Sequence, residues 1–190
     1  MNQNAYLDES FKNHDFTSEQ LLGIEFDNCA FDGCNFDSQN LKGVRFLECT
    51  FNNCNLSNTM VEKASFHEVT FTNCKMLGIH FTRCNRIGFA IQAIGCQLSH
   101  SIFHQMDLTR SQFSDCLMHE VDLAETALIK VSLVRCDLRD AMFDLTDLHG
   151  ADLSGAINYS IDPDRNNIKN ARFSYPDVLA LLSKYQIEVD

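Results

Sequence analysis

The sequence predicts an all-β solenoid, because two regularities run through most of its 190 residues. A large apolar residue returns at every fifth position along almost all of the stretch from Phe11 to Leu153. Like residues also return at every twentieth position, as in Phe11, Phe31, Phe51 and Phe71. A period of five fits neither the 3.6 residues of a helical turn nor the 2 of a long strand, so a repeat is indicated. A chain that returns above itself every twenty residues stacks like side chains into ladders, so we expect coils of four five-residue units.

Composition and charge limit the class of protein. The chain is 45% hydrophobic, which is enough to form a buried core within one domain. The formal net charge of -11 and the pI near 4.9 argue against direct binding to nucleic acid or to an anionic membrane surface. The N-terminal sequence lacks the pattern of a signal peptide, and no apolar run approaches the length of a membrane span. We therefore expect a soluble, cytoplasmic protein.

Each five-residue unit has two inward positions and a corner. The large apolar residue, here called the centre, follows two positions after a small or β-branched residue such as Val44 or Ala141. Residues two apart share one face of an extended segment, so both side chains are expected to point inward. The remaining positions turn the corner, and turn formers such as Asn13 and Gly33 stand two residues after a centre.

The nine cysteines follow the same pattern. Each stands two residues before a centre, Cys84 being counted to position 86. A free cysteine behaves as a compact hydrophobe, so this regularity indicates buried packing residues rather than disulfides. The residues concerned are Cys29, Cys34, Cys49, Cys54, Cys74, Cys84, Cys96, Cys116 and Cys136.

A register break interrupts the repeat within residues 85–94, where the pattern gains two residues. Arg86 stands where a centre belongs, and Phe89 falls in a competing register. One interpretation is a two-residue bulge at a corner. The other is a projecting loop in which Arg86, Ile87 and Phe89 contact a partner, since repeat scaffolds often carry function on loops.

The repeat fades after Leu153, so we expect a β-helical region over 1–155 and a C-terminal segment over 156–190. Ser174 is expected to be a helix N-cap, with Asp177 three residues later. Ile187 and Val189 then alternate and indicate a short terminal strand. The apolar residues of this helix and strand are Val178, Leu179, Leu181, Leu182, Tyr185, Ile187 and Val189.

No group of residues indicates an enzyme. His100, His104 and Asp107 form the best cluster, but on a coil they fall on corners of adjacent faces and do not converge. The sequence contains no Gly-rich phosphate loop, no Gly-x-Ser-x-Gly, no Cys-x-x-Cys and no His-Glu-x-x-His. We expect no catalytic residue, no cofactor and no metal, while a thiol or metal sensor built on stacked cysteines stays open as an alternative.

Negative charge is concentrated in the second half of the chain. From Asp107 to Asp164, twelve acidic residues face four basic ones, a net charge of -8. One interpretation is an acidic surface that keeps the solenoid soluble. The other is a narrow rod whose carboxylates imitate the phosphates of duplex DNA. The outward acids expected to meet a partner are Asp115, Glu120, Asp122, Asp137, Asp140, Asp144, Asp147 and Asp152.

Units such as Cys29-Ala30-Phe31-Asp32-Gly33 and Ala151-Asp152-Leu153-Ser154-Gly155 resemble those of the pentapeptide repeat proteins. The resemblance implies a right-handed quadrilateral β-helix of about seven coils. The later segment Asn158-Tyr159-Ser160-Ile161-Asp162 is similar to the tail of the albicidin-resistance type, which is akin to the fluoroquinolone-resistance members.

This resemblance implies a non-enzymatic DNA mimic. Such a protein binds DNA gyrase, and possibly topoisomerase IV, and protects the enzyme from a topoisomerase poison or modulates its activity. The family resemblance also implies a two-fold homodimer formed through the apolar residues of the C-terminal segment. The alternative is a general cytoplasmic scaffold for protein–protein interaction with a different partner.

Overall fold

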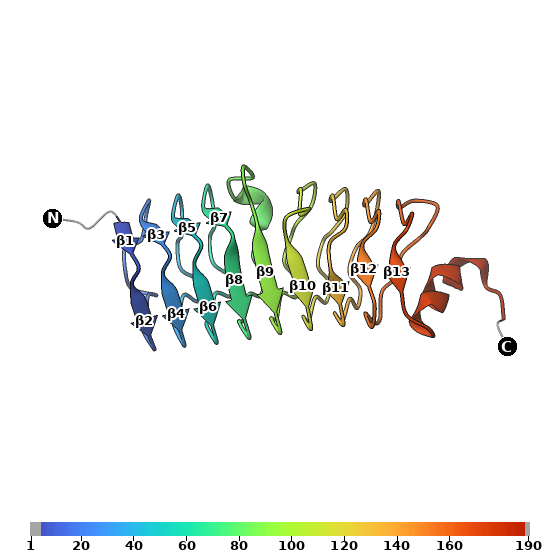
Figure 1. Cartoon of the computed structure of the whole chain (residues 1–190), viewed down its shortest axis with the longest axis horizontal. Coiled ribbons are helices and arrows are strands. Elements are labelled where there is room, and N and C mark those ends of the chain that lie inside the picture. The colour runs from blue at the N-terminus through green and yellow to red at the C-terminus, as the bar shows by residue number, and fades with distance from the viewer. Residues whose placement is uncertain (1–4, 189–190) are drawn as a thin grey trace.

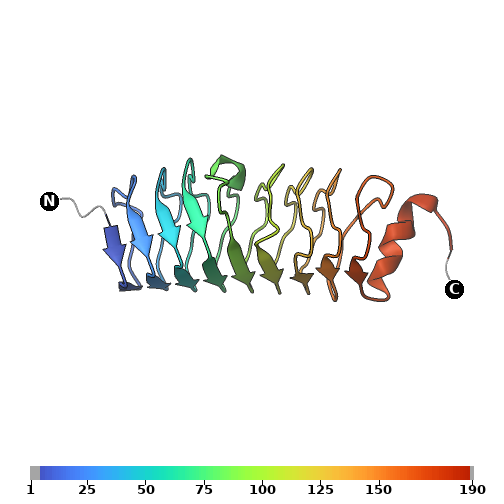
Figure 2. The same cartoon turned by 45° about the horizontal axis from the view of Figure 1, so that its top comes forward.

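The computed structural model describes residues 5–188, which form a rod of stacked coils (Figure 1). The first coil and the C-terminal helix lie at opposite ends of the rod in both views (Figures 1 and 2). The chain completes about eight turns, one more than predicted, and this confirms the predicted all-β solenoid, a right-handed quadrilateral β-helix. Regular pairing continues past Leu153, because the strand that contains this residue pairs in parallel with a strand one coil later, at Phe173.

Short parallel strands line two faces of the rod. One face carries a four-stranded sheet in the order β1-β3-β5-β7, and another carries a seven-stranded sheet in the order β11-β10-β9-β8-β6-β4-β2. A final pair, β12 and β13, continues the stack toward the C-terminus. The strands are β1 Ala5–Leu7, β2 Ser10–Lys12, β3 Glu25–Asp27, β4 Ala30–Asp32, β5 Arg45–Leu47, β6 Thr50–Asn52, β7 Ser65–His67, β8 Val69–Thr72, β9 Ile91–Ile94, β10 Gln112–Ser114, β11 Leu133–Val134, β12 Asp152–Leu153 and β13 Arg172–Phe173.

The centres form vertical columns inside the rod. Phe11 pairs with Phe31, Phe31 with Phe51, and Phe51 with Phe71. Their rings are stacked, with centroids 5.1, 4.5 and 4.9 Å apart. This spacing follows from the separation of about 4.8 Å between neighbouring strands. Phe31, Phe51 and Phe71 are completely buried, which confirms that the five-residue period marks the core.

The corners have the backbone conformation that the sequence indicates. Asn13 and Asn53 have φ of 51° and 55°, and Gly33, in the same column, has φ of 64°. A Cβ at position 33 would lie 2.4 Å from Oδ1 of Asn13, so a larger residue there would require the exposed Asn13 side chain to move. The turn formers therefore stand where the chain must enter the left-handed region.

The cysteines are packing residues, as predicted. All nine are free and buried. The Sγ atoms of Cys34 and Cys54 donate to the carbonyl oxygens of Phe11 and Phe31 in the preceding coil, over 3.4 and 3.5 Å. Burial raises the pKa of the Cys49 thiol to about 12, so this thiol remains protonated at neutral pH.

The register break is a two-residue bulge at a corner. The N–H of Asn85 still donates to the carbonyl of Ala64 in the regular register, whereas Ile91 pairs with Val69 at a spacing of 22 residues instead of 20, which leaves two extra residues between positions 85 and 91. A short 3₁₀ helix, η1 (Phe81–Arg83), precedes the bulge. The prediction that Phe89 contacts a partner was wrong, because this side chain is 3% exposed and packs against the ring of Phe66.

A 3₁₀ helix, η2 (Asp177–Tyr185), closes the C-terminal end of the rod (Figure 1). The prediction of Ser174 as its N-cap was wrong, because the Ser174 hydroxyl instead accepts a hydrogen bond from the N–H of Gly155 at 2.9 Å. Ile187 follows the helix without joining a strand, and Val189 lies outside the described residues, so the predicted terminal strand is not formed at Ile187. Across residues 5–188, no helix has the length and apolar character needed to cross a membrane.

Candidate functional site

The eight acids predicted to meet a partner encircle the rod rather than gather on one face. Four of them stand one residue before a centre, each on a different face, as their column neighbours show. Asp122 lies between Ile102 and Met142, Asp137 between Leu117 and Ile157, Asp147 between Ala127 and Asn167, and Asp152 between Ser132 and Arg172. The other four, Asp115, Glu120, Asp140 and Asp144, lie at or next to corners.

The four acids on the faces also hold the corners in place. The Oδ1 atom of each accepts a hydrogen bond from the backbone N–H two residues later, the arrangement of an Asx turn. The donors are Ala124 to Asp122, Arg139 to Asp137, His149 to Asp147 and Ser154 to Asp152, over 3.0, 3.2, 3.0 and 2.9 Å. In the N-terminal coils an asparagine does the same, as Asn55 does for Ser57 at 3.1 Å. These acids therefore serve the fold in addition to carrying charge.

Basic residues one coil away neutralise several of the acids. The pairs are Asp115 with Arg135 at 2.6 Å, Asp144 with Arg165 at 2.5 Å and Asp152 with Arg172 at 3.8 Å. The hydrogen bonds from Arg135 lower the pKa of the Asp115 carboxyl. Within residues 5–188, Asp140 and Asp147 have no basic partner. Only some of the eight predicted acids therefore carry a negative charge that no basic residue neutralises.

Asp137 is the most enclosed of the paired acids, with 14% of its side chain exposed. It accepts a hydrogen bond from Nδ2 of Asn158 at 2.8 Å and lies 2.9 Å from Nε2 of His119. Burial raises the pKa of the Asp137 carboxyl, but these two contacts and the hydrogen bond from the Arg139 N–H together outweigh burial and leave the pKa below its ordinary value. Asp137 is therefore a fixed, ionised part of the coil and presents little surface to a partner.

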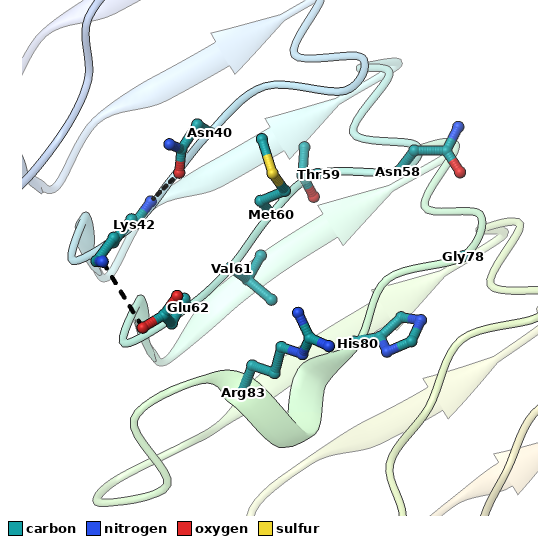
Figure 3. Close-up of a pocket in the computed structure, with 10 residues that line it drawn as sticks. All are labelled: Asn40, Lys42, Asn58, Thr59, Met60, Val61, Glu62, Gly78, His80 and Arg83. Atoms are coloured by element: carbon teal, nitrogen blue, oxygen red, sulfur yellow. Dashed lines mark hydrogen bonds and ion pairs between the residues drawn. The ribbon is translucent and has the colours of Figure 1, made fainter.

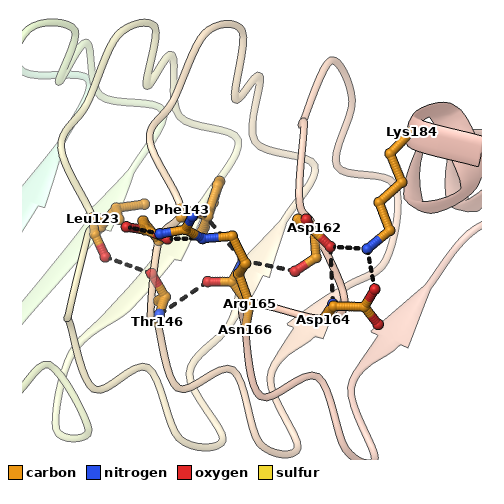
Figure 4. A network of polar contacts seen from close by, with 9 residues as sticks. Leu123, Phe143, Thr146, Asp162, Asp164, Arg165, Asn166 and Lys184 are labelled. Carbon is orange, nitrogen blue, oxygen red and sulfur yellow. Dashed lines mark hydrogen bonds and ion pairs between the residues drawn. The ribbon is translucent and has the colours of Figure 1, made fainter.

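A polar network that the sequence interpretation missed joins η2 to the last coil (Figure 4). Lys184 of η2 pairs with both Asp162 and Asp164. Beneath them, the buried side chain of Asn166 accepts from the N–H of Thr146 at 2.9 Å and donates to the carbonyl of Asp162 at 2.9 Å. The spacing of twenty residues between Asp164 and Lys184 is the signal in the sequence that could have revealed this contact.

The residues predicted to form a dimer interface divide into two groups. Leu181 packs against the end of the core together with Ala180, and Val178 and Leu179 are half-buried. Leu182, Tyr185 and Ile187 are exposed at 37%, 51% and 56%. The described part of the terminal segment therefore leaves apolar side chains uncovered, to which Tyr175, 80% exposed, also contributes.

The tip of the bulge exposes two of the three residues predicted to form a contact loop. Nη1 of Arg86 donates to the carbonyl of Gln105 at 3.0 Å, so its side chain lies against the next coil. Ile87 is 79% exposed. No group of three or more potential ligands within residues 5–188 is arranged to hold a metal ion.

Two family models match the sequence. A model of the pentapeptide repeat region matches residues 24–93, and a model of eight pentapeptide repeats matches residues 122–157. A search of curated proteins finds no match.

Solved structures of the same fold are similar to this chain along most of its length. Full-length QnrB1, a plasmid-mediated fluoroquinolone resistance protein, is 15% identical with a TM-score of 0.59, and the match covers 96% of this chain and 100% of that one. HetL, a pentapeptide repeat protein involved in heterocyst differentiation regulation in Nostoc sp. strain PCC 7120, is 15% identical with a TM-score of 0.57, covering 90% of this chain and 87% of that one. At these identities the likeness shows the fold, and with the two family models it shows that the chain belongs to the pentapeptide repeat family.

Proposed function

We propose that this protein is a cytoplasmic, non-enzymatic DNA mimic that binds DNA gyrase, or the related topoisomerase IV, and protects it from a topoisomerase poison or modulates its activity. The density of negative charge along the rod supports the proposal most directly. Residues 107–164 carry a net charge of -8. At a rise of about 4.8 Å per coil, they span about three coils, or about 14 Å. Duplex DNA carries about eight phosphate charges over the same length.

Residues that follow this stretch reduce the surplus. Arg165, Arg172 and Lys184 pair with acids of the preceding coil, and residues 107–184 together carry a net charge of -5. The proposed mimicry therefore depends on the acids that lack an Arg or Lys partner. Among the predicted acids, and within the described residues, these are Glu120, Asp122, Asp140 and Asp147, of which Glu120 and Asp140 occupy one corner in successive coils.

A homodimer through the C-terminal segment is part of the proposal. The exposed side chains of Leu182, Tyr185 and Ile187 support it, because uncovered apolar groups at the end of a rod favour association with a second copy. A tail-to-tail arrangement about a two-fold axis extends the acidic rod to about twice its length. Substituting Leu182→Asp and Tyr185→Asp together is expected to halve the mass measured by light scattering.

A general interaction scaffold with another partner is the second candidate. HetL, which shares the fold at a similar TM-score, is involved in the regulation of differentiation. The two functions differ in the partner recovered when the tagged protein is purified from cells. Topoisomerase subunits are expected for the DNA mimic, and their absence together with another abundant partner would favour the scaffold.

The decisive experiment is a titration of gyrase supercoiling, with and without a fluoroquinolone, in which binding is also measured at increasing salt. We expect the protein to inhibit supercoiling or to restore it in the presence of the drug, and binding to weaken as salt screens the carboxylates. The triple variant Glu120→Gln, Asp140→Asn, Asp147→Asn is expected to bind at least tenfold more weakly.

A matched control removes three charges from the N-terminal coils, with Glu9→Gln, Asp27→Asn and Glu48→Gln. These substitutions change the net charge by the same amount but lie outside residues 107–164. The control is therefore expected to bind like the wild type. If the wild-type protein neither affects supercoiling nor binds gyrase in a salt-dependent way, the proposal fails.

A further inference from the structure

The sign of the charge changes along the rod. Residues 1–41 carry a net charge of -7 and residues 107–164 carry -8, but residues 42–86 between them carry +3. A short basic band thus lies between two acidic stretches, on a chain whose overall charge is -11. This band is separate from the acids considered for DNA mimicry.

The basic band contains a groove of about 530 Å³ (Figure 3). Met60 and Val61 lie between Lys42, from the preceding coil, and Arg83, from the following coil. The side chain of Met60 is 54% exposed, so the groove offers apolar surface in addition to charge. Helix η1 supplies Arg83 and places it beside this apolar surface (Figure 3).

The cations around the groove are only partly compensated. Lys42 lies 3.7 Å from Glu62, which is a loose pair between exposed side chains. Lys63 is the neighbour of Arg83 across the coils, since its N–H donates to the Arg83 carbonyl at 2.8 Å. Neither Lys63 nor Arg83 forms an ion pair with any residue in the described range 5–188. Arg83, which lines the groove, and Lys63, whose backbone is hydrogen-bonded to Arg83 beside the groove, are therefore available to an anionic partner.

We propose that this groove binds a short acidic peptide segment of a partner protein. An apolar side chain of the segment contacts Met60, and its carboxylates pair with Arg83 and Lys63. A peptide meets these requirements because it can combine apolar and acidic side chains within a few residues. A nucleic acid fits less well, because its phosphates continue in both directions into stretches of net charge -7 and -8, which repel them.

The test uses a fluorescein-labelled peptide in which six aspartate and glutamate residues flank a single leucine, with fluorescence anisotropy measured on the full chain at low salt. We expect saturable binding that weakens as salt is added, and no binding of the peptide with lysine in place of the acids. Replacing the leucine of the peptide by glycine, or substituting Met60→Gln in the protein, is expected to weaken binding several-fold. No effect of either change would overturn the apolar part of the proposal.

Charge-reversal variants distinguish binding at a defined site from non-specific electrostatic attraction. Arg83→Glu with Lys63→Glu is expected to weaken binding at least tenfold, and the milder pair Arg83→Gln with Lys63→Gln at least threefold. The matched control, Lys75→Glu with Lys12→Glu, makes the same charge change at exposed positions that neither line the groove nor bond to the backbone of Arg83, and it is expected to leave binding unchanged.

Several outcomes contradict the proposal. Equal losses in the groove variant and its control would show that only net charge matters. If a duplex DNA oligonucleotide binds more tightly than the peptide, and Arg83→Glu with Lys63→Glu abolishes this binding, the groove is a site for nucleic acid. If the chain associates with itself and the same double variant abolishes this association, the groove is an interface with a second copy. Unchanged thermal unfolding of each variant is required for these comparisons.

Discussion

The coils before and after the register break fill the same columns with different side chains. Before the break, one column consists of stacked phenylalanine rings from Phe11 to Phe71, which pair in sequence. After the break, the same column holds Ala93, Phe113 and Leu133, all buried. In the first half, strands of three or four residues line two faces of the rod. After the break the strands become shorter, and β11, β12 and β13 have two residues each. The coil therefore needs an apolar centre but not an aromatic one, and ring stacking adds further stabilisation.

The outer surfaces of the two halves differ through one position of the repeat. Asn35 and Asn55 cap corners in the first half, and Asp137 caps the corner in the same column in the second half. Asparagine and aspartate each accept a hydrogen bond, through a side-chain oxygen, from the backbone N–H two residues later. Exchange of asparagine for aspartate at this position thus changes the surface charge while preserving the corner hydrogen bond.

The largest expected effect tests the difference in the core. Phe51→Ala is expected to lower the free energy of unfolding by about 3–5 kcal/mol, because it removes a buried ring together with its two stacking partners. Leu133→Ala, in the same column after the break, is expected to cost less, about 2–4 kcal/mol. Urea unfolding followed by circular dichroism measures both. Equal losses would show that ring stacking adds nothing to burial.

The next effect tests the charged caps of the second half through pH. The folded-state pKa of Asp137 is lowered, so its ionised form stabilises the coil above the unfolded pKa, and this contribution is lost as pH falls below about 4. Asp137→Asn is therefore expected to lower the free energy of unfolding by about 1.5–3 kcal/mol at pH 7, the range for hydrogen bonds to a charged group. Urea unfolding at pH 7 and at pH 3 should show the deficit shrinking at the lower pH.

The control for this pH effect lies in the first half. Asn55→Ala removes the corresponding corner hydrogen bond, but an amide does not titrate, so its cost is expected to be the same at both pH values. A deficit of Asp137→Asn that does not change with pH would contradict the assignment of the effect to the carboxylate.

The smallest expected effect concerns the corners. Leu145 has φ of 54° and is 63% exposed, so its side chain gains little burial while its backbone occupies the left-handed region. Leu145→Gly is expected to raise the free energy of unfolding by up to about 1 kcal/mol. Asn58→Gly, at a corner of the first half with φ of 56°, is expected to change it by less than about 0.5 kcal/mol, since asparagine tolerates this conformation. Thermal unfolding compares the two, and a destabilised Leu145→Gly would contradict the prediction.

The five-residue period was sufficient to predict the core, the corners and the position of the register break, because each depends on side-chain size or turn preference within one unit. The last coil was harder to predict. Asn166 occupies an inward position with a polar side chain, and only its hydrogen bonds to the neighbouring coil make that position tolerable. A pattern of apolar residues cannot reveal such a contact.

The candidate surfaces were predicted only in part for a related reason. The acids are outward-facing, as expected, but their partners lie one coil away. Asp115 with Arg135 and Asp152 with Arg172 are each twenty residues apart, so a search for opposite charges at the coil period would have found them. The groove beside Met60 depends on the path of η1, for which the repeat provides no signal.

The bulge between positions 85 and 91 has a practical consequence for protein engineering. Pairing is intact on both sides of it, since Phe71 of β8 still pairs with Ala93 of β9. The two extra residues therefore form a local bulge, and the columns of side chains after it keep their order. Ile87 at its tip points into solvent, whereas a Cβ at position 88 would lie 2.5 Å from the His67 ring, so substitution of Gly88 would require that ring to move. A short tag or fluorophore site inserted between Ile87 and Gly88 would mark the middle of the rod without disturbing either half.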